Sequence, residues 1–270
     1  MVVQHNLSAM NTNRQMGVVT SALQKSTEKL SSGYKINRAG DDAAGLSISE
    51  KMRSQIRGLN KASDNAQDGI SLIQVAEGAL NETHSILQRM NELATQAAND
   101  TNTSVDRQSI KDEIKQLNEE LDRISSTTQF NKQDLLTGGF SGKLQVGALE
   151  GQTMDVKISL AVSAKGLNVS AVEVSTNAKA GDAMQSIQDA IESVSKQRSK
   201  LGAIQNRLEH TINNLDTNAE NTQAAESRIR DTDMADEMVQ YSKNNILSQA
   251  GQSMLTQANQ QTQGVLSLLQ

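Results

Sequence analysis

The sequence predicts a mainly α-helical protein, a bundle of long coiled-coil helices with a small β-hairpin region. The first observation is compositional: the 270 residues include no proline, no tryptophan, two tyrosines and two phenylalanines. Proline breaks helices by removing a backbone donor, so its absence permits very long ones. Aromatic side chains supply much of the buried area of thick cores, so their scarcity favours a narrow bundle packed by aliphatic residues. The second observation is an apolar repeat of seven residues in separate segments of the chain.

The first two predicted helices lie in the N-terminal half. In the first, apolar residues recur every seven positions from Leu59 to Ala94, which is typical of the buried stripe of one long helix. The polar stretch NDTNTSVD at residues 99–106 interrupts the pattern, and Ser104 or Asp106 is the expected N-cap of the helix that follows. That second helix carries its apolar residues in steps of four and three, at Ile110, Ile114, Leu117, Leu121 and Ile124.

A third long helix is predicted in the C-terminal half. Apolar residues again recur every seven positions from Ile187 to Leu215, and Ile191, Ile204 and Ile212 form a second row beside them. Three helices that are each apolar on one side can hide these stripes by packing together. A helical bundle or coiled coil over residues 41–232 is therefore expected.

Between the second and third helices the apolar period changes to two. In the stretch GKLQVGALEGQTMDVKISL, apolar residues alternate with polar ones on both sides of the turn-like LEGQ. This pattern predicts a β-hairpin, and the following LNVSAVEVS continues the β-branched bias less regularly. The β-hairpin region is therefore expected near residues 143–175. Because this interval is short, any further outer domain would be small or absent.

The two ends of the chain, residues 1–40 and 233–270, form another class of segment. The pattern of each segment predicts a weak amphipathic helix, whose few apolar residues lie among Asn, Gln, Ser and Thr. Neither carries enough apolar surface to offset the entropy of ordering it alone. The apolar tip formed by Val265, Leu266, Leu268 and Leu269 likewise needs a surface to cover it. It is covered either by other copies or partners, or by docking on its own domain, and periodicity leaves both open.

Charge and motifs exclude several functional classes. The net charge of −5 is not that of a nucleic-acid-binding protein. No apolar run approaches the roughly 20 residues that span a bilayer, and the first ten residues do not resemble a secretory signal. We therefore expect no nucleic-acid partner and no membrane partner.

Nothing in the sequence indicates an enzyme, a metal site or a cofactor. The three histidines, His5, His84 and His210, are far apart, and no HExxH motif is present. Paired carboxylates have simpler interpretations: Asp41 is the expected N-cap of the helix DDAAGLSISEKM, with Asp42 near the positive end of its dipole. We expect no catalytic residue.

Several long motifs resemble bacterial flagellin. They are LSSGYKINRAGDDAAGLSISEKM, ASDNAQDGISLIQVAEGALNE, LQRMNELATQAANDTN and TQFNKQDLL in the first half, and NQQTQGVLSLLQ at the end. Their order and length make the resemblance specific, and it covers residues 1–145 and 180–270. It implies that residues 1–40 and 233–270 are the two parts of a filament-core domain. It also implies that residues 41–232 form the surrounding helical bundle, with none of the outer domains that many flagellins carry.

The resemblance also implies a function and a set of partners. Flagellins are exported unfolded through the flagellum's own channel without a cleaved signal, and they polymerise outside the cell into the motility filament. The partners implied are further copies of the chain, an export chaperone that binds the C-terminal segment, and the filament cap and junction proteins. Two alternatives stay open: a hook–filament junction protein, and a secreted ligand directed at a host.

A recognition surface follows from the same resemblance. In flagellins bound by the flagellin-sensing Toll-like receptor, an Arg, a Leu and a Glu are central contacts, and Arg89, Leu93 and Glu113 stand in those places, with Gln88 and Gln96 as neighbours. The spacing of Arg89, Leu93 and Gln96 predicts one face beside the buried stripe. The plainer interpretation is that Leu93 packs inside the bundle and that the two charges are solvated. The resemblance assigns lengthwise subunit contacts to the same surface.

Three residues depart from the family pattern. Met90 replaces a usual Val, Asn91 a usual Arg, and Gln270 a common final Arg. Loss of the Arg at position 91 removes a charge near the recognition face. The leucines of the C-terminal tip resemble the piece of flagellin that is recognised by cytosolic NOD-like receptors, in addition to their expected burial in the filament core.

Overall fold

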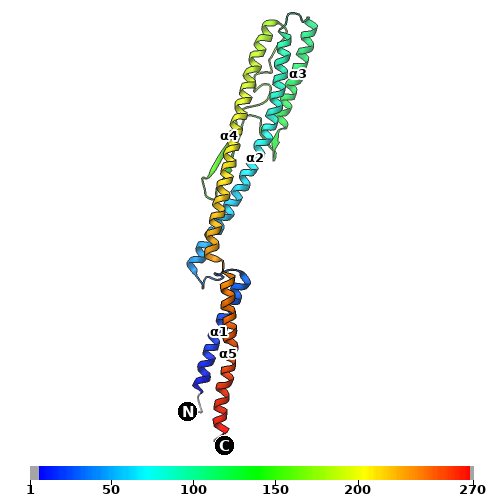
Figure 1. Cartoon of the computed structure of the whole chain (residues 1–270). Coiled ribbons are helices and arrows are strands. Elements are labelled where there is room, and N and C mark those ends of the chain that lie inside the picture. Colours follow the sequence, from blue (N-terminus) through cyan, green and yellow to red (C-terminus); the bar gives the residue numbers. More distant parts are fainter. Residues whose placement is uncertain (1–5, 268–270) are drawn as a thin grey trace. The chain divides into compact units, whose positions relative to one another are not determined.

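The computed structural model describes residues 6–267, and the side chains up to residue 261. Five helices carry the chain: α1 (Leu7–Ser32), α2 (Ala43–Ala97), α3 (Ser104–Thr127), α4 (Asn177–Arg230) and α5 (Met234–Ser267). Figure 1 shows them in sequence colours. The expected mainly α fold of long helices is confirmed. None of the described helices contains an apolar stretch long enough to cross a membrane.

The chain forms two compact units. One comprises residues 55–220, and the other combines the segment before residue 55 with the segment after residue 220. The units therefore divide within α2 and α4, whereas the domain boundaries expected at residues 40 and 233 fall in the breaks between helices.

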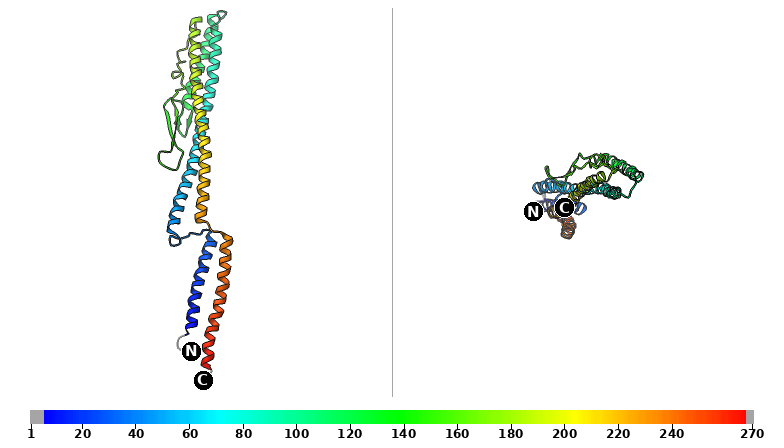
Figure 2. Two further views of the ribbon diagram at one scale, coloured as in Figure 1. Left: turned by 60° about the vertical axis from the view of Figure 1, so that its left-hand side comes forward. Right: turned by 90° about the horizontal axis from the view of Figure 1, so that it is seen from above.

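The unit of residues 55–220 is a bundle of α2, α3 and α4. The apolar stripes predicted from the sequence are its core, and Ile73, Leu80, Leu87, Ile114, Leu121, Ile187 and Leu201 are almost completely buried. The helices α2 and α4 are antiparallel. Near one end of the bundle Ser63 Oγ donates to Asp216 Oδ1 at 3.0 Å, and near the other Asn177 Nδ2 donates to the carbonyl of Ala98. Figure 2 shows the two helices side by side along this unit.

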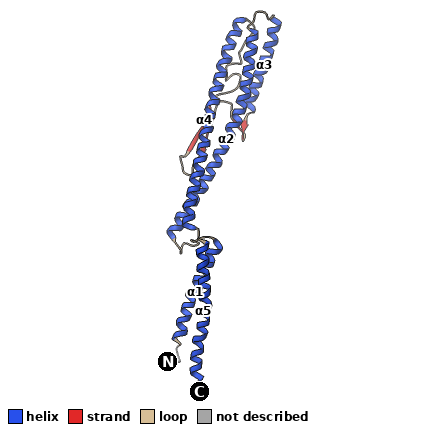
Figure 3. Ribbon diagram, in the orientation of Figure 1, coloured by secondary structure: helices blue, strands red, loops and turns tan. Residues whose placement is uncertain are grey.

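The predicted hairpin is confirmed as β3 (Phe140–Gln145) and β4 (Thr153–Ile158), which pair antiparallel with Leu144 opposite Met154. It begins three residues before the expected start at residue 143. Its inward residues Met154, Val156 and Ile158 are buried in the bundle core, and Figure 3 shows the strands beside the helices. A second, two-residue pair, β1 (Gln129–Phe130) with β2 (Gln133–Asp134), follows α3 and was not expected.

The expected β-structure stops at Ile158, although the region was predicted to extend to residue 175. The segment from residue 159 to 176 is irregular apart from an isolated bridge between Ala161 and Thr137. Its backbone forms local turns, such as the bond from the amide of Val169 to the carbonyl of Ala164 at 2.9 Å, and two side chains of α3 add further bonds. Asp122 accepts a hydrogen bond from the amide of Ala164 at 2.8 Å, and Asn118 donates to the carbonyl of Val169 at 3.3 Å. Its β-branched residues, such as Val169 and Val174, are completely buried against the helices.

The other unit is built on the antiparallel pair α1 and α5 (Figure 3), with the first turns of α2 and the last turns of α4. Its two helix breaks are bound to each other. The amide of Lys35 donates to the carbonyl of Arg230 at 2.7 Å, the amide of Thr232 donates to the carbonyl of Gly33 at 3.0 Å, and the Arg230 guanidinium lies 4.5 Å from the centre of the Tyr34 ring. Within this unit the two breaks therefore form one paired connection, which joins α1 and α5 to the first turns of α2 and the last turns of α4.

Two expected helix caps are corrected by the structure. Asp42, and not Asp41, caps α2, because its side chain accepts from the amide of Gly45 at 2.9 Å. Asp41 accepts instead from the amides of Arg38 and Asn37 in the preceding turn. The N-cap of α3 is Thr103, which forms a capping box with Asp106, and Ser104 is the first helical residue. A cap depends on which amides are left without a helical partner, so neighbouring Asp or Ser residues compete for the position.

Candidate protein–protein interface

Arg89 on α2 and Glu113 on α3 form the centre of an exposed charged cluster. Arg89 donates from Nε and Nη2 to Glu113 Oε1, at 3.0 and 2.9 Å, and from Nη1 to Glu92 Oε2 at 3.2 Å. The side chains of Arg89 and Glu113 remain 51% and 45% exposed. The hydrogen bond to Glu113, followed by that to Glu92, raises the pKa of Arg89 further above its usual range. A fixed, solvent-facing Arg–Glu pair can be recognised by a partner protein without first being ordered.

Gln88 and Gln96 lie on the exposed side of α2 on either side of Arg89. The Gln88 Nε2 atom is 3.0 Å from a ring nitrogen of His84, one turn earlier. The structure thus brings four of the five residues expected at this surface, Gln88, Arg89, Gln96 and Glu113, to the outside of two neighbouring helices.

Leu93 does not share this exposed face. Its side chain is 2% exposed and belongs to the core between the helices. The expectation that it flanks the buried stripe is wrong because α2 packs against both α3 and α4 and buries a wider arc than a single stripe. In the folded chain Leu93 can support the surface from beneath, and it offers a partner almost no area.

Met90 and Asn91, which depart from the family pattern near this surface, are buried to different extents. Met90 is completely buried, so its replacement of Val changes core packing. Asn91 is partly buried, and its side-chain oxygen is enclosed without a hydrogen-bond partner in the described structure. Neither adds a charge to the cluster around Arg89.

A second candidate surface covers α1 and α5. Among the described side chains of their unit, Ile36 and Ala258 are the buried apolar ones, whereas many large apolar side chains face solvent. The most exposed are Leu7 at 70%, Val239 at 67% and Ile246 at 66%, and the others are Met10, Val18, Ile48, Met234, Met238, Leu247 and Met254. Of the expected C-terminal tip, Leu268 and Leu269 lie outside the described residues, as do the side chains of Val265 and Leu266.

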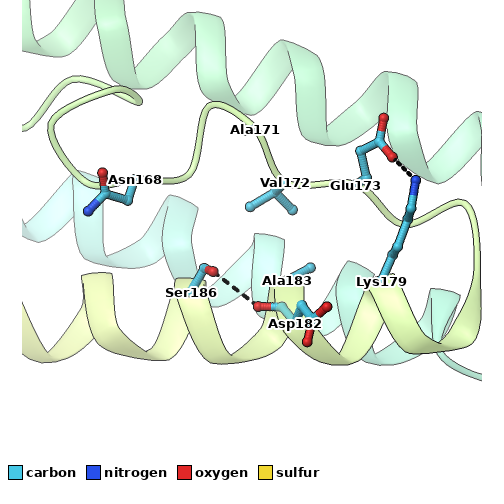
Figure 4. A pocket seen from close by; sticks show the side chains of 8 residues that line it. All are labelled: Asn168, Ala171, Val172, Glu173, Lys179, Asp182, Ala183 and Ser186. Carbon is cyan, nitrogen blue, oxygen red and sulfur yellow. Dashed lines mark hydrogen bonds and ion pairs between the residues drawn. The ribbon is translucent and has the colours of Figure 1, made fainter.

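An open groove of about 310 Å³ lies between the segment 168–173 and the start of α4 (Figure 4). Of its three charged lining residues, Glu173 and Lys179 are paired with each other, and the third is Asp182. Glu173 is bound by Lys179 and lies 3.8 Å from Lys111, and these partners, Lys179 foremost, lower the pKa of the Glu173 carboxyl. Among the described residues no group of three His, Asp or Glu side chains is arranged to hold a metal ion.

Comparison with known families identifies the family of this chain. Residues 3–141 match the bacterial flagellin N-terminal helical region, and residues 184–269 match the bacterial flagellin C-terminal helical region. The chain belongs to the bacterial flagellin family. As a flagellin family member it is 56% identical over 271 residues to the flagellin of Halalkalibacterium halodurans, with 100% of both chains covered.

Two further relatives agree with this family. The flagellar filament 31.3 kDa core protein of Treponema maltophilum is 51% identical over 286 residues, again with 100% of both chains covered. Among solved structures, Bacillus cereus flagellin is 34% identical with a TM-score of 0.51, over 60% of this chain and 94% of that one. The long helices and small strand pairs described above are therefore a flagellin fold.

Proposed function

We propose that this chain is a structural subunit that polymerises into a bacterial flagellar filament, and that α1 and α5 provide the main adhesive surface. The observation that carries the proposal is the exposed apolar surface of these two helices, from Leu7 on α1 to Met254 on α5. A concentration of large exposed apolar side chains on one pair of helices indicates an interaction site. The flagellin family, with its filament core proteins, supplies the identity of the partner as further copies of the chain.

The physical basis of assembly is burial of this surface by neighbours. In an open filament each copy uses one patch against a different patch of the next copy, so contacts can be added without limit. Binding that buries apolar area only in the assembled state also stabilises the folded form of the helices. Ordering of α1 and α5 is therefore coupled to polymerisation.

Seeded polymerisation tests the proposal. Purified chain is mixed with short filament fragments and examined by electron microscopy, and long filaments are expected. A hook–filament junction protein, which is the alternative subunit, would add to filament ends without elongating them. Absence of long filaments at high concentration and with seeds would overturn the proposal.

For the exposed surface around Arg89 we propose recognition by the flagellin-sensing Toll-like receptor and lengthwise contact between subunits. The solvent-facing Arg89–Glu113 pair supports this, because Arg residues are enriched among the energetic centres of interfaces. Leu93, being buried, contributes through the core in this proposal. The C-terminal segment is proposed as the part bound by the export chaperone and by NOD-like receptors.

Arg89→Ala tests the recognition surface, and Arg123→Ala is its matched control. Arg123 is likewise an exposed arginine bound to a nearby carboxylate, that of Glu120, and lies outside the cluster. Arg89→Ala is expected to weaken receptor binding by roughly tenfold or more and to reduce motility. Unchanged receptor affinity in Arg89→Ala, or an equal loss in Arg123→Ala, would contradict the assignment. Deletion of the gene with no loss of motility would favour a ligand directed at a host over a filament subunit.

A further inference from the structure

A long stretch of α2 carries only negative charge. Between Lys61 and Arg89 the acidic residues are Asp64, Asp68, Glu77 and Glu82, and no Lys or Arg is present. Asp64, Asp68 and Glu82 are exposed and follow one another at spacings that place them on the same side of the helix, opposite the buried stripe. We call this side of α2 the acidic stripe.

The neighbouring stretch of α4 carries only positive charge. Between Glu192 and Glu209 the basic residues are Lys196, Arg198, Lys200 and Arg207, and no Asp or Glu is present. Lys196, Lys200 and Arg207 are exposed and share the outer side of the helix, which we call the basic stripe. Arg198 lies elsewhere on α4, facing Glu77 of α2 at 3.9 Å, and this contact puts the two stretches at one level of the bundle.

The folded chain leaves most of these charges unused. In the part of the chain that the structure describes, Asp68, Glu82, Lys200 and Arg207 have no ion-pair partner, while Asp64 and Lys196 have partners on their own helices, Lys61 and Glu192. Between their charged residues both stripes carry short, uncharged side chains. The centre of the acidic stripe holds Ser71, Val75 and Gly78, and the centre of the basic stripe holds Ala203.

Val75 points to what covers the acidic stripe. It is a large apolar side chain in the middle of a charged helix face, and it is 42% exposed in the single chain. Asp68, Val75 and Glu82 are spaced by seven residues, and Lys196 and Ala203 have the same spacing. A helix that presents small or apolar residues between two charges can approach a second helix closely along that line.

We propose that the acidic stripe of α2 is a lateral contact that receives the basic stripe of α4 from a second copy of this chain. The inference rests on the proposed filament, because both stripes of every copy are then engaged by different neighbours, as a heterologous contact requires. Charge complementarity identifies the partner, because one chain carries both an acidic and a basic stripe, and the two stripes are opposite in charge and lie at one level of the bundle.

The antiparallel course of α2 and α4 fixes the direction of the contact. When two copies stand side by side in the same orientation, α2 of one meets α4 of the next antiparallel. In that arrangement Glu82 faces Lys196 and Val75 faces Ala203. Arg207 then lies about one helical turn from the level of Asp68, and its long side chain extends toward that carboxylate. Exposed ion pairs contribute little individually, so the stripes serve mainly to select the correct neighbour and its alignment.

A charge swap in the full chain tests the contact. One variant reverses the basic stripe (Lys196→Glu with Arg207→Glu), one reverses the acidic stripe (Asp68→Lys with Glu82→Lys), and a third combines all four changes. Each is polymerised on seeds of its own sequence, and the critical concentration is measured by sedimentation. Each single-stripe reversal is expected to raise the critical concentration roughly tenfold, and the combination is expected to restore it because opposite charges face each other again.

Net charge is controlled by a variant that reverses Lys115 and Lys165 (Lys115→Glu with Lys165→Glu), two exposed lysines outside both stripes. It changes the net charge as much as reversal of the basic stripe, and it is expected to assemble like the original chain. Circular dichroism checks that each variant is folded. If the reversal of the basic stripe does not fold, the milder pair Lys196→Gln with Arg207→Gln replaces it. The lateral contact is wrong if the combined variant does not recover the original critical concentration, or if the control shows an equal defect. In either case the proposed function stands as long as the original chain polymerises. If the original chain itself does not polymerise, both fall.

Discussion

Arg89 and Leu93 lie one helical turn apart on α2, and their environments assign them different roles. Arg89 is held at the surface by Glu113 and Glu92, whereas Leu93 is enclosed between the helices. Sequence spacing alone places both beside the buried stripe. A substitution at either position could therefore weaken recognition, for opposite reasons: loss of a surface contact at Arg89, and loss of core packing at Leu93.

Leu93→Ala is expected to destabilise the bundle by about 2–5 kcal/mol, because it removes buried methyl groups and leaves a cavity. Chemical denaturation of the monomer measures this free energy of unfolding. Arg89→Ala is the control and should leave the denaturation midpoint almost unchanged, since the residue it truncates is exposed. A Leu93→Ala chain as stable as the original would mean that Leu93 is not part of the core.

Asp106 couples the start of α3 to pH. Its hydrogen bonds with the side chain and then the amide of Thr103 lower the pKa of its carboxyl below the usual 3.8. A carboxyl whose pKa is lowered by folding stabilises the fold above its unfolded pKa, and the benefit is lost as the pH falls. Asp106→Asn should therefore lower the melting temperature at pH 7, and the difference from the original chain should shrink as the pH falls below about 4.

Asp112→Asn is the comparison for that titration. Asp112 lies on the same helix, is exposed, and accepts a hydrogen bond only from the side chain of Gln108 within the described structure. It should change the melting temperature less at pH 7. A deficit of Asp106→Asn that persists undiminished at pH 3 would show that the capping carboxylate is not its source.

At the scale of elements, the apolar period predicts which helices form, but it does not give the arc that each buries. The stripes from Leu59 to Ala94 and from Ile187 to Leu215 correctly predict α2 and α4, because a repeat of seven defines one line of contact. Leu93 was misplaced because a second neighbour, α3, covers another side of α2. The segment after Ile158 was misread because its buried valines pack on helices, and β-branched residues alone do not reveal whether a strand partner exists.

The hairpin docks on α2 at positions without a side chain. A Cβ atom at Gly58 would lie 2.9 Å from the Cβ atom and 3.3 Å from the Cα atom of Ala148 in the hairpin turn, whereas at Gly78 nothing lies within 4 Å. Gly78→Ala should stabilise the monomer by roughly 0.5–1 kcal/mol through helix propensity alone. Gly58→Ala should not stabilise the monomer, because the added methyl group forces the hairpin backbone at Ala148 to shift and this offsets the gain in helix propensity.

Denaturation midpoints of the two glycine variants, measured side by side, give the comparison. Because both positions lie inside α2, the gain in helix propensity is the same and the difference reports the docking of the hairpin. Equal stabilisation by Gly58→Ala and Gly78→Ala would mean that the turn at Ala148 does not pack against α2.

At the scale of the whole molecule, the two units differ in how much of their apolar surface is covered. The bundle of residues 55–220 buries its stripes in a continuous core, while the unit of α1 and α5 leaves many of its large apolar side chains exposed. Composition predicts this difference, because both ends are rich in uncharged polar residues and contain few apolar ones. It could not identify what covers the ends, because the sequence pattern of one chain does not describe a surface supplied by another molecule. In the proposed filament that surface belongs to other copies.

Because α1 and α5 bury less apolar surface than the bundle, we expect them to be locally less stable in the monomer. This difference should disappear in the filament. In the monomer, amide hydrogens of α1 and α5 should exchange much faster than those of α2 and α4 within residues 55–220, because few buried contacts oppose local opening. In filaments the same amides should become protected, since neighbouring copies bury the exposed apolar side chains. Hydrogen exchange read by mass spectrometry on peptides from residues 7–32 and 234–261 measures both states, and peptides from residues 110–124 serve as the internal reference. Equal protection of the terminal helices in monomer and filament would show that the single chain already stabilises its own ends, and the coupling of folding to polymerisation would then be wrong.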